Sequence, residues 1–300
     1  MNRIAIALQS VRRESANGMG YALRWFWLRF YLRMIRRRWP GLPAPTAADL
    51  ARPLTIVIPS TEKDAAILEH CLQSVRETVA NPIAAIWVVA PESERIRALA
   101  AAHQAQFVHE DKILPRPAAE LKVRGWLLQQ FIKLNAANFV ETNDYLVLDS
   151  DTLFLRPQYF FRGGRTVLRY SDQYELLYNR SLSLIFGHTR RFPVSFVTHH
   201  SVFERSAIQS LLAALEQRFQ LPWWKAIIEV IDRGHSHMIS FAEYELYGHF
   251  ITDQPGWKKR FALEYWNGLD LEGPDIASLD KLRREVGPRC NSLSFHRHTQ

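Results

Sequence analysis

Apolar residues in the first half of the chain follow two alternating patterns. Short β-branched runs at residues 54–58 and 83–89 predict buried strands, and a third short strand is expected at residues 107–108. Apolar positions at helical spacing predict helices over residues 64–79, 95–104 and 124–139, and later over 207–219 and 223–232. Because strands that alternate with helices form parallel sheets, the pattern predicts an α/β fold with helices on both faces of a mostly parallel central sheet.

The next apolar run, residues 145–148, ends at two aspartates separated by one serine. Asp149 and Asp151 would lie beyond the carboxyl end of this strand, where open α/β sheets bind ligands. Two carboxylates there suit a hard cation that also binds phosphate oxygens, as Mg²⁺ usually does. A turn after an edge strand is the alternative, since Asp and Ser are common in turns. The apolar residues 152–155 favour the ligand site, because burial resumes at once.

Several short motifs occur together in a consistent order over roughly residues 53–250. They are Val57-Ile58-Pro59-Ser60 with Lys63-Asp64, Gly125-Trp126-Leu127-Leu128-Gln129-Gln130 with Lys133, Leu148-Asp149-Ser150-Asp151, Thr198-His199-His200, and Glu243-Tyr244-Glu245-Leu246-Tyr247-Gly248. This ordered set resembles the nucleotide-sugar glycosyltransferases of the GT-A fold, and more closely a bacterial group of Asp-x-Asp glycosyltransferase-like proteins. An Asp-x-Asp motif alone is a weak signal, and the ordered set is a much stronger one.

The resemblance implies a GT-A-like fold and a metal-dependent glycosyltransferase of hexosyltransferase type. It would transfer a sugar from a nucleotide diphosphate sugar to a glycan or lipid-linked acceptor in cell-surface polysaccharide synthesis. The metal, Mn²⁺ or Mg²⁺, would be held by Asp149, Asp151 and His296. Glu243 would be the base or orient the acceptor, with Asp149 as a second catalytic residue, and retention or inversion stays open. The residues expected to contact the donor are Pro59, Ser60, Asp64, Gln130, Lys133, Asp149 and Ser150.

Several of these residues also have a structural interpretation. Gln130 would lie on an exposed polar face, Glu243 would be a solvated or capping glutamate, and His296 would lie in a disordered chain end. Of His199 and His200, at most one is expected to enter the site, because neighbouring side chains on a strand point to opposite faces. The other would be a hydrogen-bonded core histidine.

The first fifty residues differ from the rest in charge. They hold nine Arg and two acids, a net charge of +7, whereas the remainder holds 29 basic and 28 acidic residues, a net charge of +1. Within residues 21–38 one side of a helix would carry Trp25, Leu28, Tyr31, Leu32 and Ile35, and the other Arg29, Arg33, Arg36 and Arg37. We predict an N-terminal amphipathic helix that lies on an anionic membrane surface through residues 21–39. The arginines exclude a membrane-spanning helix. The alternative is a helix packed on the protein's own core.

The stretch Pro40-Gly41-Leu42-Pro43-Ala44-Pro45 indicates a stiff linker. It divides the chain into a membrane-surface segment, residues 1–45, and a transferase domain, residues 46–300. Within that domain residues 46–156 would bind the nucleotide sugar and residues 157–300 would form the acceptor side.

The composition also limits partners and compartment. The nearly neutral body and the lack of a nucleic-acid-binding motif argue against nucleic acid as a partner. Two distant cysteines, Cys71 and Cys290, predict no disulfide and a reducing compartment. With no cleaved signal expected, we predict a cytoplasmic protein that is peripheral on the inner face of the cell membrane. Two rival classes remain: a non-catalytic sugar-nucleotide or glycan-binding module on the same fold, and a membrane-surface scaffold.

Overall fold

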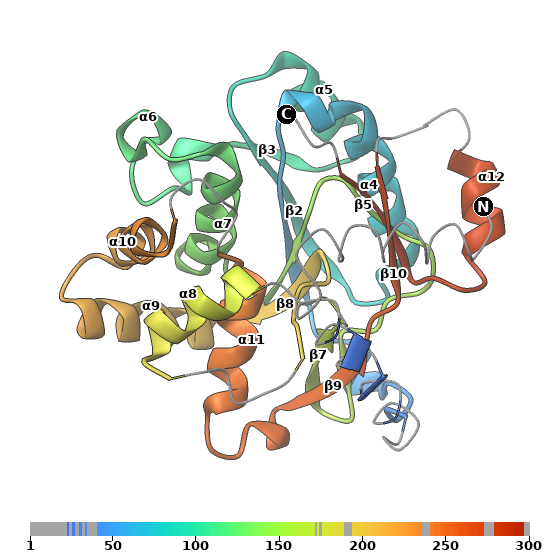
Figure 1. Cartoon of the computed structure of the whole chain (residues 1–300). Coiled ribbons are helices and arrows are strands. Elements are labelled where there is room, and N and C mark those ends of the chain that lie inside the picture. Colours follow the sequence, from blue (N-terminus) through green and yellow to red (C-terminus); the bar gives the residue numbers. More distant parts are fainter. Residues whose placement is uncertain are drawn as a thin grey trace.

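The computed structural model describes residues 41–171, 173, 176–188, 194–235, 241–272 and 279–296, and six single positions between residues 23 and 34. A five-stranded sheet forms its centre, with strand order β3-β2-β1-β4-β8 (Figure 1). Four of these strands run parallel and β8 is antiparallel to β4. The bounds are β1 (Leu54–Pro59), β2 (Ile83–Ala90), β3 (Gln106–His109), β4 (Asp144–Leu148) and β8 (His200–Glu204). The mostly parallel α/β sheet predicted from the sequence is confirmed.

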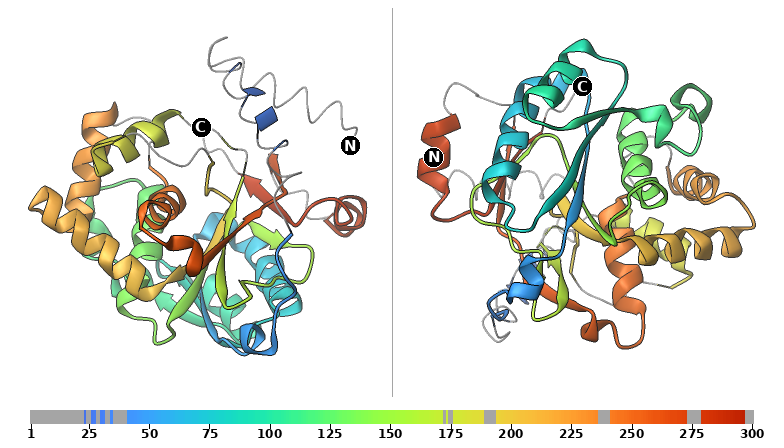
Figure 2. Two further views of the ribbon diagram at one scale, coloured as in Figure 1. Left: turned by 90° about the horizontal axis from the view of Figure 1, so that it is seen from below. Right: turned by 180° about the vertical axis from the view of Figure 1, so that it is seen from behind.

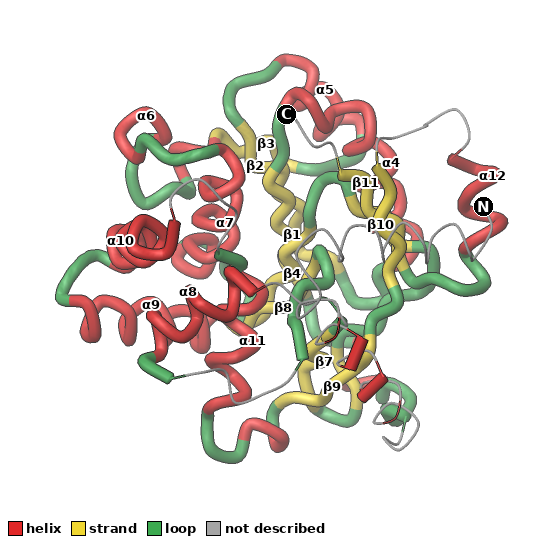
Figure 3. Tube along the Cα trace, in the orientation of Figure 1, coloured by secondary structure: helices red, strands yellow, loops and turns green. Residues whose placement is uncertain are grey.

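Strands β1 and β4 are buried at every position, because helices cover both faces of the sheet. Alternate residues of each strand face opposite ways, so the two faces carry separate apolar clusters. One cluster packs against α4 (Ala65–Thr78) and α5 (Glu94–Ala102), and the other against α7 (Gly125–Asn135), α9 (Arg205–Phe219) and α11 (Glu243–Asp253). Figure 3 shows the strands enclosed between these two groups of helices.

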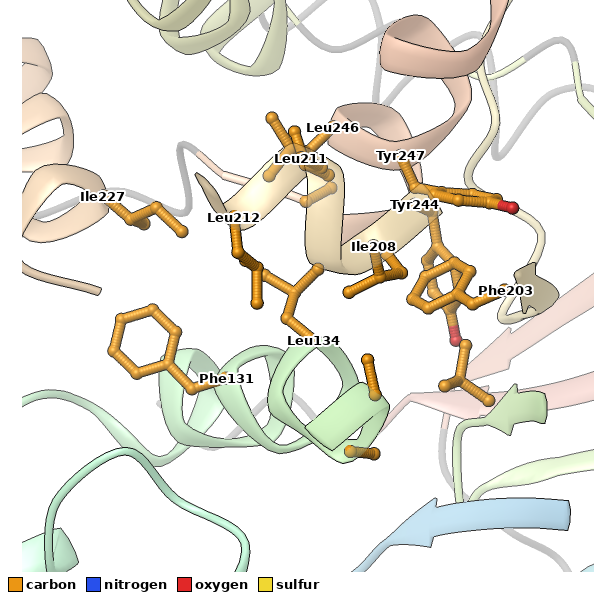
Figure 4. Packing of buried hydrophobic residues seen from close by; sticks show 14 of the residues in the cluster. Phe131, Leu134, Phe203, Ile208, Leu211, Leu212, Ile227, Tyr244, Leu246 and Tyr247 are labelled. Atoms are coloured by element: carbon orange, nitrogen blue, oxygen red, sulfur yellow. The ribbon is translucent and has the colours of Figure 1, made fainter. Parts of the chain in front are cut away.

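The contact between α7, α9 and α11 follows from helical spacing. Ile208, Leu211, Leu212 and Leu215 of α9 are buried three or four residues apart and form one stripe. They meet residues of α7 and α11, including Leu134, as Figure 4 shows. Each fully buried leucine or isoleucine contributes roughly 1.5–3 kcal/mol relative to an exposed one. This packing holds α7 and α11, and therefore the side chains they carry, in fixed positions.

Two small sheets flank the central one. The first contains β5 (Thr152–Phe154), β10 (Gly268–Glu272) and β11 (Ser292–His296), and the second contains β6 (Phe161–Arg162), β7 (Arg165–Tyr170) and β9 (Phe261–Tyr265). The first lies with α12 (Leu279–Val286) at one side of the molecule, away from α8 (Leu176–Phe186) and α10 (Trp223–His235) (Figure 2). Shorter helical segments are α3 (Ala47–Leu50), α6 (Ala118–Leu121), η1 (Glu62–Asp64), η2 (Glu110–Lys112), η3 (Ala136–Asn138) and η4 (Trp257–Lys259).

Asp49 holds the first residues of the domain in place by hydrogen bonds. Its carboxylate accepts hydrogen bonds from the backbone N–H groups of Gly163 and Gly164 at 2.8 and 2.9 Å, and from Thr46 in a capping box. Gly163 and Gly164 have φ angles of 60° and 75°, which glycine adopts without steric cost. Asp49 thus ties the start of the domain to the β6–β7 hairpin.

One difference from the sequence prediction concerns the strand that carries the two histidines. His199 and His200 were both expected to lie on a strand, but the strand begins only at His200, and His199 has a φ of 60°. Strand β8 comes from the predicted acceptor side, so both predicted parts supply strands to the central sheet. Both cysteines are free thiols.

The predicted amphipathic helix lies mostly outside the described residues, including Trp25, Leu28, Leu32 and Ile35 and the four arginines placed opposite them. At the six described positions the backbone is helical, and every side chain there is at least 41% exposed. These side chains are Leu23, Phe26, Trp27, Phe30, Tyr31 and Met34. Across the described part of the chain, we find no helix with the length and apolarity needed to cross a membrane.

Candidate active site

The order of the strands in the central sheet reverses between β1 and β4. The chain proceeds from β1 outward to β2 and β3, and then returns so that β4 lies on the other side of β1. In α/β proteins, ligands bind beyond the carboxyl ends of the strands at such a reversal. Ser60 follows β1 there, and Asp149 follows β4. The Ser60 hydroxyl is buried and has no hydrogen-bond partner among the described residues.

Helices α7 and α11 carry Lys133 and Glu243 to Asp149. The Lys133 ammonium donates to Asp149 Oδ1, to Glu243 Oε1 at 2.6 Å and to the Tyr244 hydroxyl oxygen at 3.1 Å. Tyr244 in turn donates its hydroxyl proton to Asp149 Oδ1 at 3.1 Å. Lys133, Glu243 and Tyr244 are all at most 4% exposed. The three N–H donors of Lys133 are therefore all used within the protein.

These buried charges shift one another's pKa values. Burial alone would lower the pKa of Lys133, but the charges of Asp149 and Glu243 outweigh it and raise that pKa. Burial acts against ionisation of Asp149, but Lys133 and His199 outweigh it and hold its pKa well below the usual value. For Glu243, burial outweighs the attraction of Lys133, so its pKa is raised. Asp149 is thus the firmly ionised acid, and Glu243 the one that retains a proton more readily.

Gln130 and Glu243 are both buried, whereas the structural alternatives for them included positions exposed to solvent. Gln130 is 3% exposed, so the alternative of an exposed polar face is wrong. Its Oε1 accepts a hydrogen bond from the backbone N–H of Glu243 at 3.1 Å. That N–H belongs to the first turn of α11, where helices leave N–H groups without internal partners. Glu243 is 2% exposed, so it is not a solvated glutamate.

The two glutamates of α11, Glu243 and Glu245, have different hydrogen-bond partners. Glu245 points away from Lys133 and accepts from Ser195 Oγ at 2.5 Å and from the Phe196 backbone N–H at 3.2 Å. It orders the segment that leads to the two histidines.

One histidine enters the site and the other does not, as predicted. His199 Nδ1 lies 3.2 Å from Asp149 Oδ2, and its Nε2 lies 3.4 Å from Asp270 Oδ1. Burial would lower the pKa of His199, but its hydrogen bonds to the two carboxylates raise it well above the usual value. His200 is fully buried and contacts Arg169 and the Thr198 carbonyl oxygen. Sequence reasoning did not find the roles of Tyr244, Asp270 and Arg169; only Tyr244 lies within a recognised motif.

The C-terminal strand brings the backbone of His296 to the same edge. Strand β11 pairs antiparallel with β5, with Ser294 opposite Thr152, and the Phe295 N–H donates to the Asp151 carbonyl oxygen at 3.0 Å. The next residue along β11 is His296, whose side chain lies outside the described residues. The backbones of the three predicted metal ligands, Asp149, Asp151 and His296, therefore lie at the same edge of the sheet.

The residue types at this edge fit a hard divalent cation. Carboxylates and imidazole suit Mn²⁺, and Mg²⁺ needs only one or two carboxylates when phosphates and water complete its shell. Among the described side chains no three His, Cys, Asp or Glu residues already lie close enough to form a metal centre. Among the residues that the structure describes, Asp149 Oδ1 has two donors, Lys133 and Tyr244, and Oδ2 has one, His199. Because each carboxylate oxygen can accept about two contacts, Oδ2 retains one position.

The remaining predicted donor contacts lie near the same edge. Pro59 ends β1, and Asp64 follows it in η1, where it accepts from Thr61 Oγ1 at 3.2 Å. Asp64 and Ser150 are 8% and 4% exposed.

A separate cavity of about 330 Å³ lies at the opposite end of the sheet, where β4 begins and β8 ends. None of the residues predicted for the site lines it. The lining residues are Arg52, Asn143, Asp144, Glu204, Arg205, Ser206 and Gln209.

Comparison with known proteins gives a family match and several distant structural similarities. Residues 51–281 match the family described as Family of unknown function (DUF6492). No protein with a curated description matches the sequence.

Three of the similar solved structures are transferases or synthases. A galactosyltransferase LgtC, in complex with donor and acceptor sugar analogues, is 15% identical, with 82% of this chain and 88% of that chain covered and a TM-score of 0.47. Mouse xyloside xylosyltransferase 1 is 13% identical, with 81% and 97% covered and a TM-score of 0.44. Glucosyl-3-phosphoglycerate synthase from Mycobacterium tuberculosis, with Mn²⁺, uridine diphosphate and glucosyl-3-phosphoglycerate, is 15% identical, with 83% of each chain covered and a TM-score of 0.39. At these low scores the similarities carry no weight for the activity.

Proposed function

The chain belongs to the Family of unknown function (DUF6492), which names no activity. From the chain's own residues, we propose that the protein is a metal-dependent glycosyltransferase that uses a nucleotide diphosphate sugar. One observation carries this proposal. Asp149 and Asp151 follow β4 at the point where the strand order reverses, and Ser60, whose buried hydroxyl has no hydrogen-bond partner within the described part of the chain, follows the neighbouring strand β1. Two carboxylates and a buried hydroxyl at such a reversal suit a metal-bound diphosphate with sugar hydroxyls beside it. The acceptor would be a glycan or a lipid-linked glycan of cell-surface polysaccharide synthesis.

The metal would be Mn²⁺ or Mg²⁺, held by Asp149, Asp151 and His296. When bound, it would supply positive charge against the negative charge that grows on the departing diphosphate. The remaining position on Asp149 Oδ2 supports this assignment, since Oδ1 is occupied by Lys133 and Tyr244.

The chain's own residues would bind and orient the donor. Pro59, Ser60, Asp64, Gln130, Ser150 and Lys133 are the proposed donor contacts. A phosphate contact by Lys133 would replace one of its three present acceptors. Glu243 is the proposed base or acceptor-orienting group, because a raised pKa makes its carboxylate more ready to take up a proton.

A membrane-surface location is the second part of the proposal. The six exposed apolar side chains between Leu23 and Met34 are three or four residues apart along two adjacent rows, which is the pattern of one helix face. Six arginines and no acids occur within residues 21–38. Apolar side chains together with basic ones suit the headgroup region of an anionic bilayer, where the protein would meet a lipid-linked acceptor.

A thermal-shift screen of nucleotide diphosphate sugars, with and without Mn²⁺, tests the binding half of this function. A ligand that binds only the folded protein raises its stability by mass action. We expect at least one nucleotide sugar to raise the unfolding temperature, and to raise it further with Mn²⁺. Stabilisation without any Mn²⁺ effect or turnover would favour the non-catalytic binding module, and no stabilisation by any donor would remove the proposal.

A further inference from the structure

His199 lies at a bend that is closed by two hydrogen bonds between the residues on either side of it. Thr198 Oγ1 donates to the carbonyl oxygen of His200 at 2.7 Å, and His200 Nδ1 lies 2.7 Å from the carbonyl oxygen of Thr198. A carbonyl oxygen only accepts, so Nδ1 of His200 carries the proton. Both bonds span His199, whose φ of 60° lies in the left-handed region that residues other than glycine seldom adopt.

The second ring nitrogen of His200 is fixed by Arg169. Arg169 Nη1 lies 2.8 Å from His200 Nε2, and a guanidinium has only donors, so Nε2 accepts. Arg169 also donates to Glu264 Oε2 at 3.0 Å, and its guanidinium lies over the rings of Phe160 and Trp266 at 4.7 and 4.4 Å. His200 therefore has one tautomer and one orientation, and neither nitrogen is available to a ligand.

The effect of this arrangement reaches Asp149 through His199. The His199 backbone oxygen accepts the Asp149 N–H at 3.0 Å, and its imidazole lies between the carboxylates of Asp149 and Asp270. Asp149 comes from the end of β4 and Asp270 from β10, so the imidazole joins the central sheet to the sheet that contains β11. The direction of Asp149 Oδ2, the oxygen with a remaining acceptor position, depends on this contact.

We propose that Thr198, His200 and Arg169 are positioning residues that hold His199, and through it Asp149 Oδ2, in the orientation needed to bind a ligand at the Asp149–Asp151 motif. The choice of ligand, Mn²⁺, rests on the proposed function; the bracing of His199 does not. Hydrogen-bond partners of a metal-binding carboxylate typically change metal affinity 10–100-fold when they are lost.

Two variants of the full-length chain test this role, with a matched control. Thr198→Val removes one of the two bonds around His199, and Arg169→Lys keeps the charge but lacks the planar fork that reaches His200 and Glu264 together. Thr252→Val is the control, because Thr252 Oγ1 donates to the Gly248 carbonyl oxygen at 2.9 Å within α11, away from the bend. Mn²⁺ affinity is measured by calorimetry, and the histidine rings are observed by ¹⁵N NMR.

We expect Thr198→Val and Arg169→Lys to shift the ring signals of His199 and to weaken Mn²⁺ binding by roughly tenfold or more. Thr252→Val should leave both measurements as in the wild type. Unchanged His199 signals in both test variants would overturn the proposal, as would shifted signals with unchanged Mn²⁺ affinity. If the wild type binds no Mn²⁺ while the His199 signals shift as expected, the bracing stands and the metal-dependent function fails.

Discussion

At the scale of single residues, Lys133 is the clearest case of a side chain whose surroundings the sequence did not reveal. A contact with the donor was predicted for Lys133, and its ammonium is buried among Asp149, Glu243 and Tyr244. Removing one member of a buried charged group costs more than an exposed ion pair contributes, because it leaves uncompensated charge in the interior. Lys133 is therefore expected to matter for stability as well as for the site.

Lys133→Met should lower the free energy of unfolding by about 3–5 kcal/mol, because it removes the buried cation that Asp149 and Glu243 share. Adding Glu243→Gln removes one of these charges, so the double variant should be more stable than Lys133→Met alone. Urea unfolding measures both. Lys225→Met, at an exposed position, is the control and should change stability by no more than about 0.5 kcal/mol. Strictly additive effects of Lys133→Met and Glu243→Gln would contradict the buried network.

At the scale of elements, the sequence predicted those helices and strands whose burial repeats regularly. Strands β1 and β4 are continuous apolar runs because both faces are covered, and α9 has a helical stripe. The sequence did not predict the bend at His199, because an apolar run does not encode a positive φ that long-range contacts stabilise. The same holds for Asp270, which meets His199 from a strand about seventy residues away in the chain and only through the pairing of β10, β11 and β5.

Asp49 joins two elements, α3 and the β6–β7 hairpin, and its contribution should depend on pH. Burial would raise the pKa of Asp49, but its hydrogen bonds from Thr46, Gly164 and Gly163 outweigh that and lower it. A carboxyl group whose pKa is lower in the folded state than in the unfolded state stabilises the protein at pH values above its unfolded pKa, which is about 3.9 for Asp. This stabilisation is lost as the pH falls through the folded pKa.

We therefore expect Asp49→Asn to destabilise the protein by about 1–3 kcal/mol at pH 7, the usual cost of losing hydrogen bonds to a buried charged group. The difference from wild type should stay constant down to about pH 5 and shrink below about pH 4. Urea unfolding across this range measures it, with Glu69→Gln on the exposed side of α4 as control. A difference that grows with acidity would show that the carboxylate is not the stabilising form.

At the scale of the whole molecule, charge and exposed apolar surface both concentrate near the N-terminus. Anionic vesicles should bind the wild-type chain through the helix face that includes Phe26, Trp27 and Phe30, and moderate salt should weaken this binding because exposed charges are screened. Changing these three residues together to Ser should release the protein in a co-sedimentation assay. Phe139→Ser removes an apolar side chain that is 46% exposed on the body of the domain, and should not.

Two outcomes would contradict this membrane proposal. Sedimentation of the triple variant like wild type would show that another surface binds the vesicles. A wild-type protein that is dimeric, and that becomes monomeric in the triple variant without ever binding vesicles, would show that the face meets a second copy of the chain.

The central claim is that the edge formed by β1 and β4 transfers a sugar with the help of a metal held by Asp151. Mn²⁺-dependent release of nucleoside diphosphate from a nucleotide sugar tests it most directly, in wild type, in Asp151→Asn and in Glu141→Gln, an exposed acid before β4. Asp151→Asn removes charge but little volume, so we expect it to fold like wild type and to lose the metal-dependent release, while Glu141→Gln retains it. Release by a folded Asp151→Asn variant at the wild-type rate, with the same dependence on Mn²⁺, would contradict the claim.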